Sequence, residues 1–344
     1  MYESFYGLTG KPFQLNPDPA FFFGSRGHKR AYAYLQYGLY QSEGFIVITG
    51  EIGAGKTTIV RSLLEHLESD KVVAAQLVST QLDADDLLRA VGIAYGLPVR
   101  TVTKAVLLGS LEAFLCKLAI DNKRALLIVD EAQNLTPNAI EELRMLSNFQ
   151  LADKALLQSF LVGQPELRAM MQGARMQQLR QRVIASYHLG PLDKDETQTY
   201  IEHRLKHVGW TGDPEFDAGC FEHIHQLSGG IPRRINTLCD RLLLASFLVE
   251  RHKVDVADVE AIGRELREEL GPEGRSIVAS GSGRSGRAEL KDATSMNGMD
   301  LQAQFRRLEN RIDRLDRTVG AAVDLLQAFL HSENADKPGT SAER

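Results

Sequence analysis

The sequence predicts an α/β fold in which a parallel β-sheet is covered by helices and is followed by a smaller, all-helical domain. Short apolar runs typical of buried strands occur at 45–49, 72–78, 125–130 and 159–162, with a weaker candidate at 185–189. Helical patterns lie before and between them, notably at 28–40, 83–95 and 138–149. Strands that alternate with helices predict a parallel sheet with both faces covered. From about Leu192 onward the spacing is helical, at 193–208, 214–227, 232–249 and 256–270.

Composition and charge narrow the class of protein. The chain has 344 residues, 43% hydrophobic and 25% charged, an ordinary soluble composition with room for two folded units. A formal net charge of −5 argues against a basic protein that coats nucleic acid or anionic lipid. The three cysteines have no paired spacing, and we find neither a secretory signal nor an apolar run long enough to span a membrane. We therefore expect a protein of the cytoplasm.

Shifts in composition suggest where the domains begin and end. A segment at 1–44 is rich in aromatic residues and proline, the predicted sheet core covers 45–191, and the helical domain covers 192–270. A Gly/Ser-rich stretch at 271–300 predicts a flexible linker, and 331–344 a disordered tail. Between them, at 301–330, apolar residues recur with the alternating four-three spacing of a coiled coil. We expect that helix to self-associate or dock a partner; the alternative is that it folds back on the rest of the chain.

The strongest motif follows the first predicted strand and precedes a helical stretch, which is the context of a phosphate-binding loop. Glycines let the backbone turn tightly so that its N–H groups face phosphates, and the helix N-terminus favours negative charge. Lys56 is expected to reach the β- and γ-phosphates, and the Thr57 hydroxyl to bind Mg²⁺. A chance glycine-rich turn is the alternative. The predicted nucleotide-binding residues are Gly50, Glu51, Ile52, Gly53, Ala54, Gly55, Lys56, Thr57 and Thr58.

Two carboxylates follow the apolar run at 126–129, where ligands bind in open α/β sheets. Asp130 is predicted to orient Mg²⁺, and Glu131 to act as the base that polarises the attacking water. A strand that simply ends in acidic residues is the alternative. Together with the phosphate loop, this pair predicts a P-loop nucleoside-triphosphatase that uses ATP and Mg²⁺.

Three weaker signals surround this predicted site. Gln164 follows the strand at 159–162 and is a candidate sensor of the γ-phosphate, unless it only starts the next helix. Arg180 and Arg182 lie near the end of a predicted basic helix. Either one, with Arg182 preferred, could be a finger that stabilises charge on a neighbouring subunit's nucleotide; a solvated helix face is the alternative. Arg233 follows Pro232 at a helix start and is predicted to reach the γ-phosphate.

These motifs together resemble one bacterial family. FYGL, KPFQLNPDPAFFF, EGFIVITGEIGAGKTT, LLIVDEAQNL, EELRMLSNFQ, LVGQPEL, QLRQRV and GGIPRRINTLCDR are similar to the general-secretion-pathway A-type AAA+ family. Within that family the sequence most resembles the ATPase of exosortase (PEP-CTERM) and exopolysaccharide loci. The resemblance covers about 1–270. It implies a sheet core plus helical lid with ATP at their junction, and it supports the roles given to Lys56, Thr57, Asp130, Glu131 and Arg233.

The sequence departs from the secretion members in one respect. Those members carry a membrane span and a periplasmic cell-wall-binding region after the ATPase, whereas a soluble linker and a coil-like helix are predicted here. Cell-wall binding is therefore not carried over. We expect an oligomeric, Mg²⁺-dependent ATPase of the cytoplasm, peripheral to the inner membrane through its partners, that drives or switches a protein in envelope export. The rival hypotheses are a DNA-handling AAA+ ATPase and a non-catalytic, nucleotide-gated scaffold.

Overall fold

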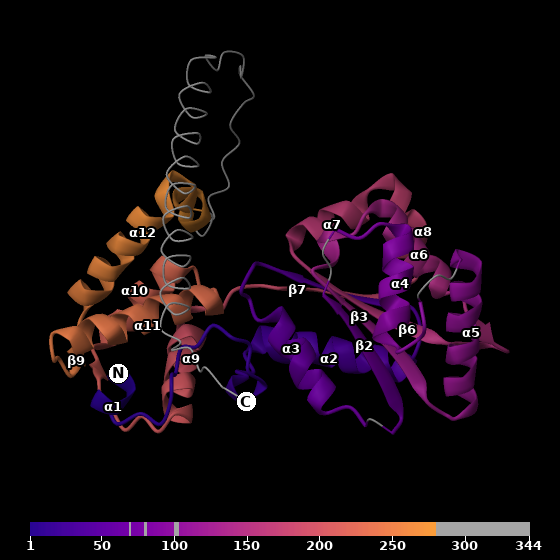
Figure 1. Cartoon of the computed structure of the whole chain (residues 1–344). Helices are drawn as coiled ribbons and strands as arrows, with labels where there is room; N and C mark the ends of the chain where they lie inside the picture. Colours follow the sequence, from indigo (N-terminus) through magenta and orange to yellow (C-terminus); the bar gives the residue numbers. More distant parts are fainter. Residues whose placement is uncertain (69, 79–80, 100–102, 280–344) are drawn as a thin grey trace, which may run out of the picture. The chain divides into compact units, whose positions relative to one another are not determined.

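The computed structural model describes residues 1–68, 70–78, 81–99 and 103–279 (Figure 1). The predicted helix at 301–330 and the tail at 331–344 lie outside the described residues. The last described helix, α12 (Val256–Ala279), continues past Leu270, so the predicted linker does not begin at residue 271. Among the helices that are described, none is long and apolar enough to cross a membrane.

A five-stranded parallel sheet forms the core, with the strand order β2-β3-β6-β1-β7. Strands β3, β6 and β1 are buried almost throughout, because both faces of the sheet are covered, and this is why their sequences are continuous apolar runs. The α/β fold class predicted from the sequence is confirmed. The strands are β1 (Phe45–Gly50), β2 (Val72–Val78), β3 (Arg124–Asp130), β6 (Leu157–Gly163) and β7 (Val183–Leu189).

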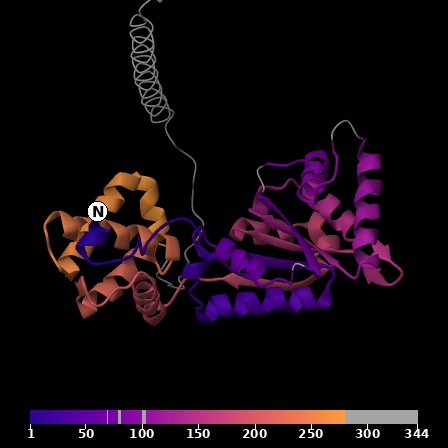
Figure 2. The ribbon, with the colours of Figure 1, turned by 60° about the horizontal axis from the view of Figure 1, so that its bottom comes forward.

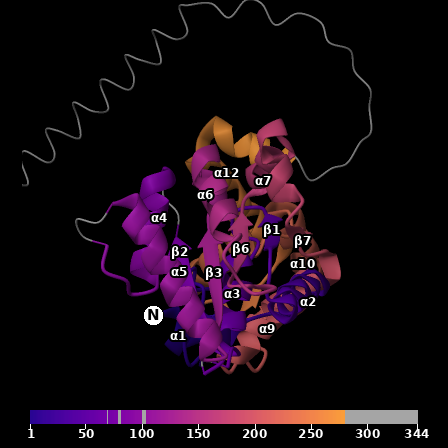
Figure 3. The same cartoon turned by 90° about the vertical axis from the view of Figure 1, so that its right-hand side faces the viewer.

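Helices cover both faces of this sheet (Figures 2 and 3). Successive residues of β3 point to opposite sides: Leu126 and Ile128 share an apolar cluster with residues of α2 (Arg26–Gln41) and α3 (Lys56–Glu65). Leu127 and Val129 belong to the cluster on the other face, with α4 (Ala84–Ala94), α5 (Lys104–Ile120) and α6 (Pro137–Leu146). The carboxyl ends of the central strands are thereby held rigidly at one edge.

The helical domain follows β7. It consists of α9 (Lys194–His207), α10 (Ala218–Ser228), α11 (Pro232–Leu248) and α12, with one short strand pair, β8 (Glu215–Phe216) and β9 (Lys253–Val254). Proline in the first turn of α11 fixes where that helix starts, because its φ already suits a helix.

The first residues of the chain pack into this helical domain. Tyr2, Tyr6 and Phe13 are buried in its apolar cluster. The Tyr6 hydroxyl donates to the carbonyl of Arg251 at 3.0 Å, and Nε of Arg204 donates to the carbonyl of Pro12 at 2.6 Å. The core of the helical domain is therefore built from two stretches far apart in the sequence. The other described elements are α1 (Tyr2–Phe5), η1 (Pro19–Phe21), η2 (Ala132–Asn134), β4 (Gln150–Leu151), β5 (Lys154–Ala155), α7 (Pro165–Gln172), η3 (Ala174–Met176) and α8 (Gln177–Arg180).

Several element boundaries differ from those predicted. Helix α5 is absent from the prediction, because apolar residues such as Val106 and Ile120 on its exposed side mask the helical spacing of its buried leucines. The helix predicted at 138–149 ends at Leu146, and the one predicted at 214–227 begins only at Ala218, because the preceding residues pair with β9. The predicted basic helix is divided into η3, which holds Arg175, and α8, and Arg182 lies after α8, just before β7.

Candidate nucleotide and magnesium site

The phosphate loop connects β1 to α3. Lys56 is the first residue of α3 and is only 5% exposed. Its Nζ donates to the carbonyl oxygens of Gly50 at 2.7 Å and Glu51 at 3.0 Å. Burial lowers the pKa of Lys56, and the charges of Glu131 and Asp130 oppose that shift. The ammonium group is thus held inside the loop by backbone carbonyls, which phosphate oxygens can replace.

Two glycines of the loop adopt conformations that only glycine tolerates well. Gly53 and Gly55 have φ of +81° and +98°, in the left-handed region. A Cβ on Gly53 would lie 2.3 Å from Cβ of Arg233, whose backbone N–H donates to the Gly53 carbonyl at 3.1 Å. A Cβ on Gly55 would lie 2.6 Å from Nε2 of His28. The loop is therefore in direct contact with α11 on one side and with α2 on the other.

The side chains of Asp130 and Thr57 lie in hydrogen-bonding contact beside the loop. Thr57 Oγ1 donates to Asp130 Oδ2 at 2.9 Å, and the other carboxylate oxygen accepts the Glu131 backbone N–H at 3.0 Å. Burial raises the pKa of Asp130, with those two hydrogen bonds opposing the shift. Oxygen donors of this kind are the ligands that Mg²⁺ prefers, and a cation would relieve the cost of a buried carboxylate. The residues fit a magnesium ion shared with nucleotide phosphates.

Glu131 follows β3 with a left-handed backbone, φ 54°, and two amides hold its carboxylate. Its Oε2 accepts hydrogen bonds from Nε2 of Gln133 at 2.6 Å and Nε2 of Gln164 at 3.0 Å. Burial raises the pKa of Glu131, but these hydrogen bonds and the charge of Lys56 outweigh it, so the pKa is lowered. The carboxylate is therefore ionised at neutral pH, as a general base must be.

Gln133 connects the ends of two neighbouring strands. While its amide nitrogen binds Glu131 after β3, its Oε1 accepts the backbone N–H of Gln164, after β6, at 2.9 Å. A Cβ on Gly163 would lie 2.7 Å from that same oxygen, so the absence of a side chain there makes the contact possible. Gln164 is thus placed beside Glu131, at the position where the sequence predicted a phosphate sensor.

A cavity of about 510 Å³ opens beside the phosphate loop. Besides the loop, its walls come from 14–18 and 21–23 of the N-terminal segment and from α9 and α11. Arg204 and Arg233 both line the cavity, and Arg233, whose backbone binds the loop at Gly53, has an exposed side chain. This volume and this mixture of apolar and cationic lining suit a nucleoside triphosphate.

Neither candidate finger arginine lines this cavity. Arg182 is half-buried, and its guanidinium donates to the Ser147 carbonyl and Oγ, both at 2.9 Å, at the end of α6. Arg180 is exposed, and it donates to the carbonyls of Met171 at 2.5 Å and Gly173 at 2.9 Å. Both arginines bind groups of their own domain, and they differ in exposure: Arg180 is the more accessible of the two, whereas the sequence prediction preferred Arg182.

The sequence motifs did not identify three residues of the site. Gln133 lies in a short 3-10 turn, and His28 lies in α2, well before the loop. Arg204 is buried, with its guanidinium 4.7 Å from the ring of Phe21. Only the position of Gln133, two residues after Glu131, was a usable signal; the other two depend on tertiary contacts.

Comparison with known proteins supports this description of the fold. Residues 39–171 match the family described as AAA domain. Over 268 residues, which are 77% of this chain and 48% of the relative, the sequence is 40% identical to General secretion pathway protein A of Aeromonas hydrophila. The chain therefore spans about half the length of that relative.

Two solved structures are similar in fold. Cdc6p from Pyrobaculum aerophilum has a TM-score of 0.55 at 17% identity, covering 78% of this chain and 73% of that chain. The ORC1 protein of Aeropyrum pernix, in complex with DNA, also has a TM-score of 0.55, at 16% identity, covering 75% and 70%. At these identities the likeness concerns the fold alone. The fold, together with the AAA domain match, is that of a P-loop protein of the AAA+ type.

Proposed function

We propose that Mg²⁺-dependent ATP hydrolysis at this site drives or switches a protein partner in envelope export. The observation that carries the proposal is the meeting of Lys56, Thr57, Asp130 and Glu131 around one loop, with an ionised Glu131 held by two amides. This is the arrangement that positions a triphosphate and a water for in-line attack.

Each side chain has a distinct part in that reaction. Lys56 and the loop N–H groups bind the β- and γ-phosphates, and Arg233 reaches them from α11. A magnesium ion held by Thr57 and Asp130 would neutralise phosphate charge as the bond breaks. Glu131 orients the attacking water and accepts its proton. Gln164, which lies beside Glu131, contacts the γ-phosphate.

The cellular process is inferred from the relative. The 40% identity to General secretion pathway protein A supports a secretion-type partner, and the sequence motifs favour an exopolysaccharide or exosortase system. We propose that the protein works in the cytoplasm as a homo-oligomer, peripheral to the inner membrane through its partner. Arg180 then acts across a subunit interface, because charge stabilisation by an arginine of a neighbour is a recurring device in such ATPases. The predicted helix at 301–330 is the proposed self-association or docking element.

The test is to express a variant that binds ATP without hydrolysing it, in the organism that encodes the protein, and to identify what purifies with it. Glu131→Gln keeps the carboxylate's shape without its basicity, so it should hold ATP and retain the partner during purification. Lys56→Ala, which should not bind ATP, is the control. Recovery of an envelope-export component with the first variant alone supports the proposal.

Two outcomes would favour the rival hypotheses. DNA that raises ATP turnover in a salt-dependent manner would indicate a DNA-handling ATPase. Nucleotide binding without measurable turnover by the unmodified protein would indicate a nucleotide-gated scaffold.

A further inference from the structure

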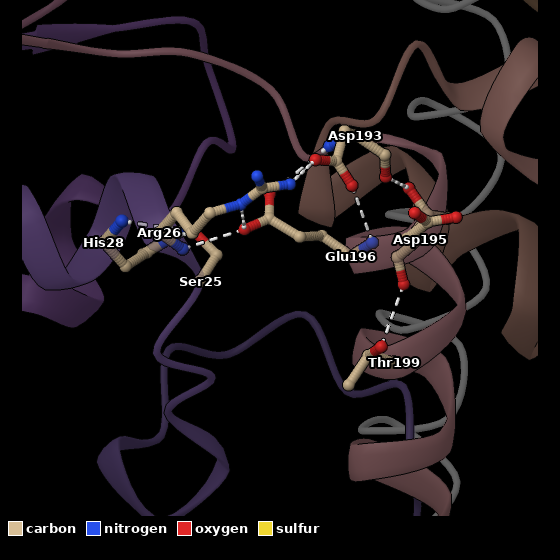
Figure 4. A network of polar contacts seen from close by, with 8 residues as sticks. Ser25, Arg26, His28, Asp193, Asp195, Glu196 and Thr199 are labelled. Atoms are coloured by element: carbon tan, nitrogen blue, oxygen red, sulfur yellow. Dashed lines mark hydrogen bonds and ion pairs between the residues drawn. The ribbon is translucent and has the colours of Figure 1, made fainter.

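A polar turn at the start of α2 lies against the phosphate loop, outside every sequence motif described above. It contains Ser25, the N-cap of α2, followed by Arg26 and His28. Figure 4 shows this turn beside the first turn of α9, with Arg26 reaching from one helix to the other. The turn thus touches both the loop and the helical domain.

His28 is a buried side chain that faces the phosphate loop. It is 6% exposed, its ring hydrogen-bonds to the backbone of Ala54, and its Nε2 lies against Gly55. Ala54 and Gly55 immediately precede Lys56, so the imidazole supports the stretch of backbone that leads into the phosphate-binding lysine. A larger side chain at position 28 would press on this backbone, and a smaller one would leave it without its contact.

Ser25 fixes the orientation of the ring. Its Oγ lies 2.7 Å from Nδ1 of His28 and also accepts the His28 backbone N–H at 3.2 Å. Burial lowers the pKa of His28, although the Ala54 backbone and Glu196 oppose this, so the ring is favoured in its neutral form. In that form Nδ1 accepts from the Ser25 hydroxyl while Nε2–H donates to the loop.

Arg26 joins the same turn to the helical domain. Its backbone N–H donates to Oε1 of Glu196 at 2.8 Å, its Nε lies 3.4 Å from the same oxygen, and its guanidinium pairs with Asp193 (Figure 4). Asp193 and Glu196 form the capping box of α9. The Glu196 carboxylate therefore accepts backbone hydrogen bonds at the N-termini of two helices, α9 in its own domain and α2 in the core.

The backbone contact matters more than the ion pair here. The Arg26 side chain is 79% exposed, and ion pairs of exposed side chains contribute little. The Glu196 side chain is only 17% exposed, and a carboxylate at a helix N-terminus is favoured by the unpaired N–H groups there. The connection from α9 to the turn thus runs mainly through Glu196.

We propose that His28 is a positioning residue of the nucleotide site: it holds the phosphate loop in its nucleotide-binding conformation, and Glu196 couples the same turn to the helical domain. The role rests on nucleotide binding at this site, as described under the proposed function. It adds a second connection between loop and helical domain, separate from the contact of Arg233 with Gly53.

The experiment measures ADP affinity with a fluorescent ADP analogue and, separately, kcat at saturating ATP. His28→Ala should weaken ADP binding roughly tenfold, because a buried backbone acceptor loses its donor, while kcat at saturation changes little. His28→Gln, whose amide can replace the Nε2–H donor, should restore most of the affinity. His225→Ala is the matched control: His225 also pairs Nδ1 with a hydroxyl, that of Thr197 at 3.0 Å, but it does not line the cavity.

Coupling through the turn is tested by combining variants. Glu196→Gln alone should weaken ADP binding less than His28→Ala does. In the double variant the loss should be smaller than the sum of the two single losses, because both act through one element. Losses that simply add would overturn the coupling.

The remaining outcomes separate the positioning role from the function itself. If the unmodified protein does not bind ADP, the proposed function and the positioning role of His28 fail together. If His28→Ala binds ADP with native affinity, the positioning role alone is overturned. A lower kcat in His28→Ala with unchanged ADP affinity overturns it as well. Should His28→Ala not fold, Ser25→Ala, which keeps the imidazole but frees the ring and removes the side-chain cap of α2, must weaken ADP binding. Native affinity in that variant would also overturn the role.

Discussion

Replacement of Gln133 by alanine tests the description of the catalytic carboxylate. Gln133 donates to Glu131 at 2.6 Å and accepts the Gln164 N–H at 2.9 Å, so the variant loses both contacts. A hydrogen bond to a charged group contributes about 1.5–3 kcal/mol. Glu131 is half-buried and keeps its bond from Gln164, which places the expected loss near the lower end. Since about 1.4 kcal/mol corresponds to a factor of ten in rate, kcat should fall roughly tenfold.

The same variant should change the pH dependence. Hydrogen bonds from Gln133 and Gln164 lower the pKa of Glu131 against the effect of burial, so removal of Gln133 moves that pKa upward. The active form is the ionised one, present above the pKa and lost as the pH falls through it. The acid limb of the kcat–pH profile should therefore shift to higher pH.

Steady-state ATP turnover between pH 5 and 9, spanning roughly the range in which carboxylate and histidine groups titrate, measures both effects. Gln36→Ala, which removes an exposed glutamine on α2, is the control. Gln133→Glu should be more damaging than Gln133→Ala, because it places a second negative charge beside Glu131. A Gln133→Ala protein with native kcat and an unmoved acid limb would refute this account of the site.

Three further predictions concern the loop, the arginines and the core. Lys56→Ala should abolish nucleotide binding, whereas Glu131→Gln should keep it and reduce turnover by about 10²–10⁴-fold, as separate binding and turnover assays would show. Arg182→Ala should lower stability by about 1–3 kcal/mol in denaturant titrations, because it frees the end of α6. Arg180→Ala should fold normally but lose turnover, and mixing it with Lys56→Ala should restore activity if the arginine acts in trans. Gly38→Ala should cost about 1–3 kcal/mol of stability, since its Cβ would lie 2.4 Å from a buried β1 side chain.

The parts of this structure that could be predicted are those with a local signal. The apolar runs of the central strands and the glycine-lysine loop are dictated by backbone geometry within a few residues. Asp130 and Glu131 are placed correctly because the end of a parallel strand is also the edge where ligands bind. Helix α5 had a weaker signal, since apolar residues such as Val106 and Ile120 also occupy its exposed side and blur the contrast that makes a helix recognisable.

The parts that could not be predicted depend on contacts between distant residues. His28 precedes the loop by a whole helix and a strand, and only the folded chain brings its ring against Gly55. The sequence did not separate Arg180 from Arg182, and in the folded chain Arg182 lies after α8, where its guanidinium binds the Ser147 carbonyl. A sequence pattern locates arginines; it does not say which carbonyl each one binds.

Because the helical domain takes its core from both ends of the described chain, the order of translation limits when it can form. Tyr2, Tyr6 and Phe13 leave the ribosome before the sheet, but the helices that cover them are translated only after it. Their aromatic side chains therefore remain uncovered during most of synthesis, when exposed apolar surface promotes aggregation. A fragment that stops before α9 keeps this aromatic segment uncovered. A fragment that begins after the aromatic segment leaves a cavity in the helical domain. The smallest fragment expected to fold in isolation must include both stretches.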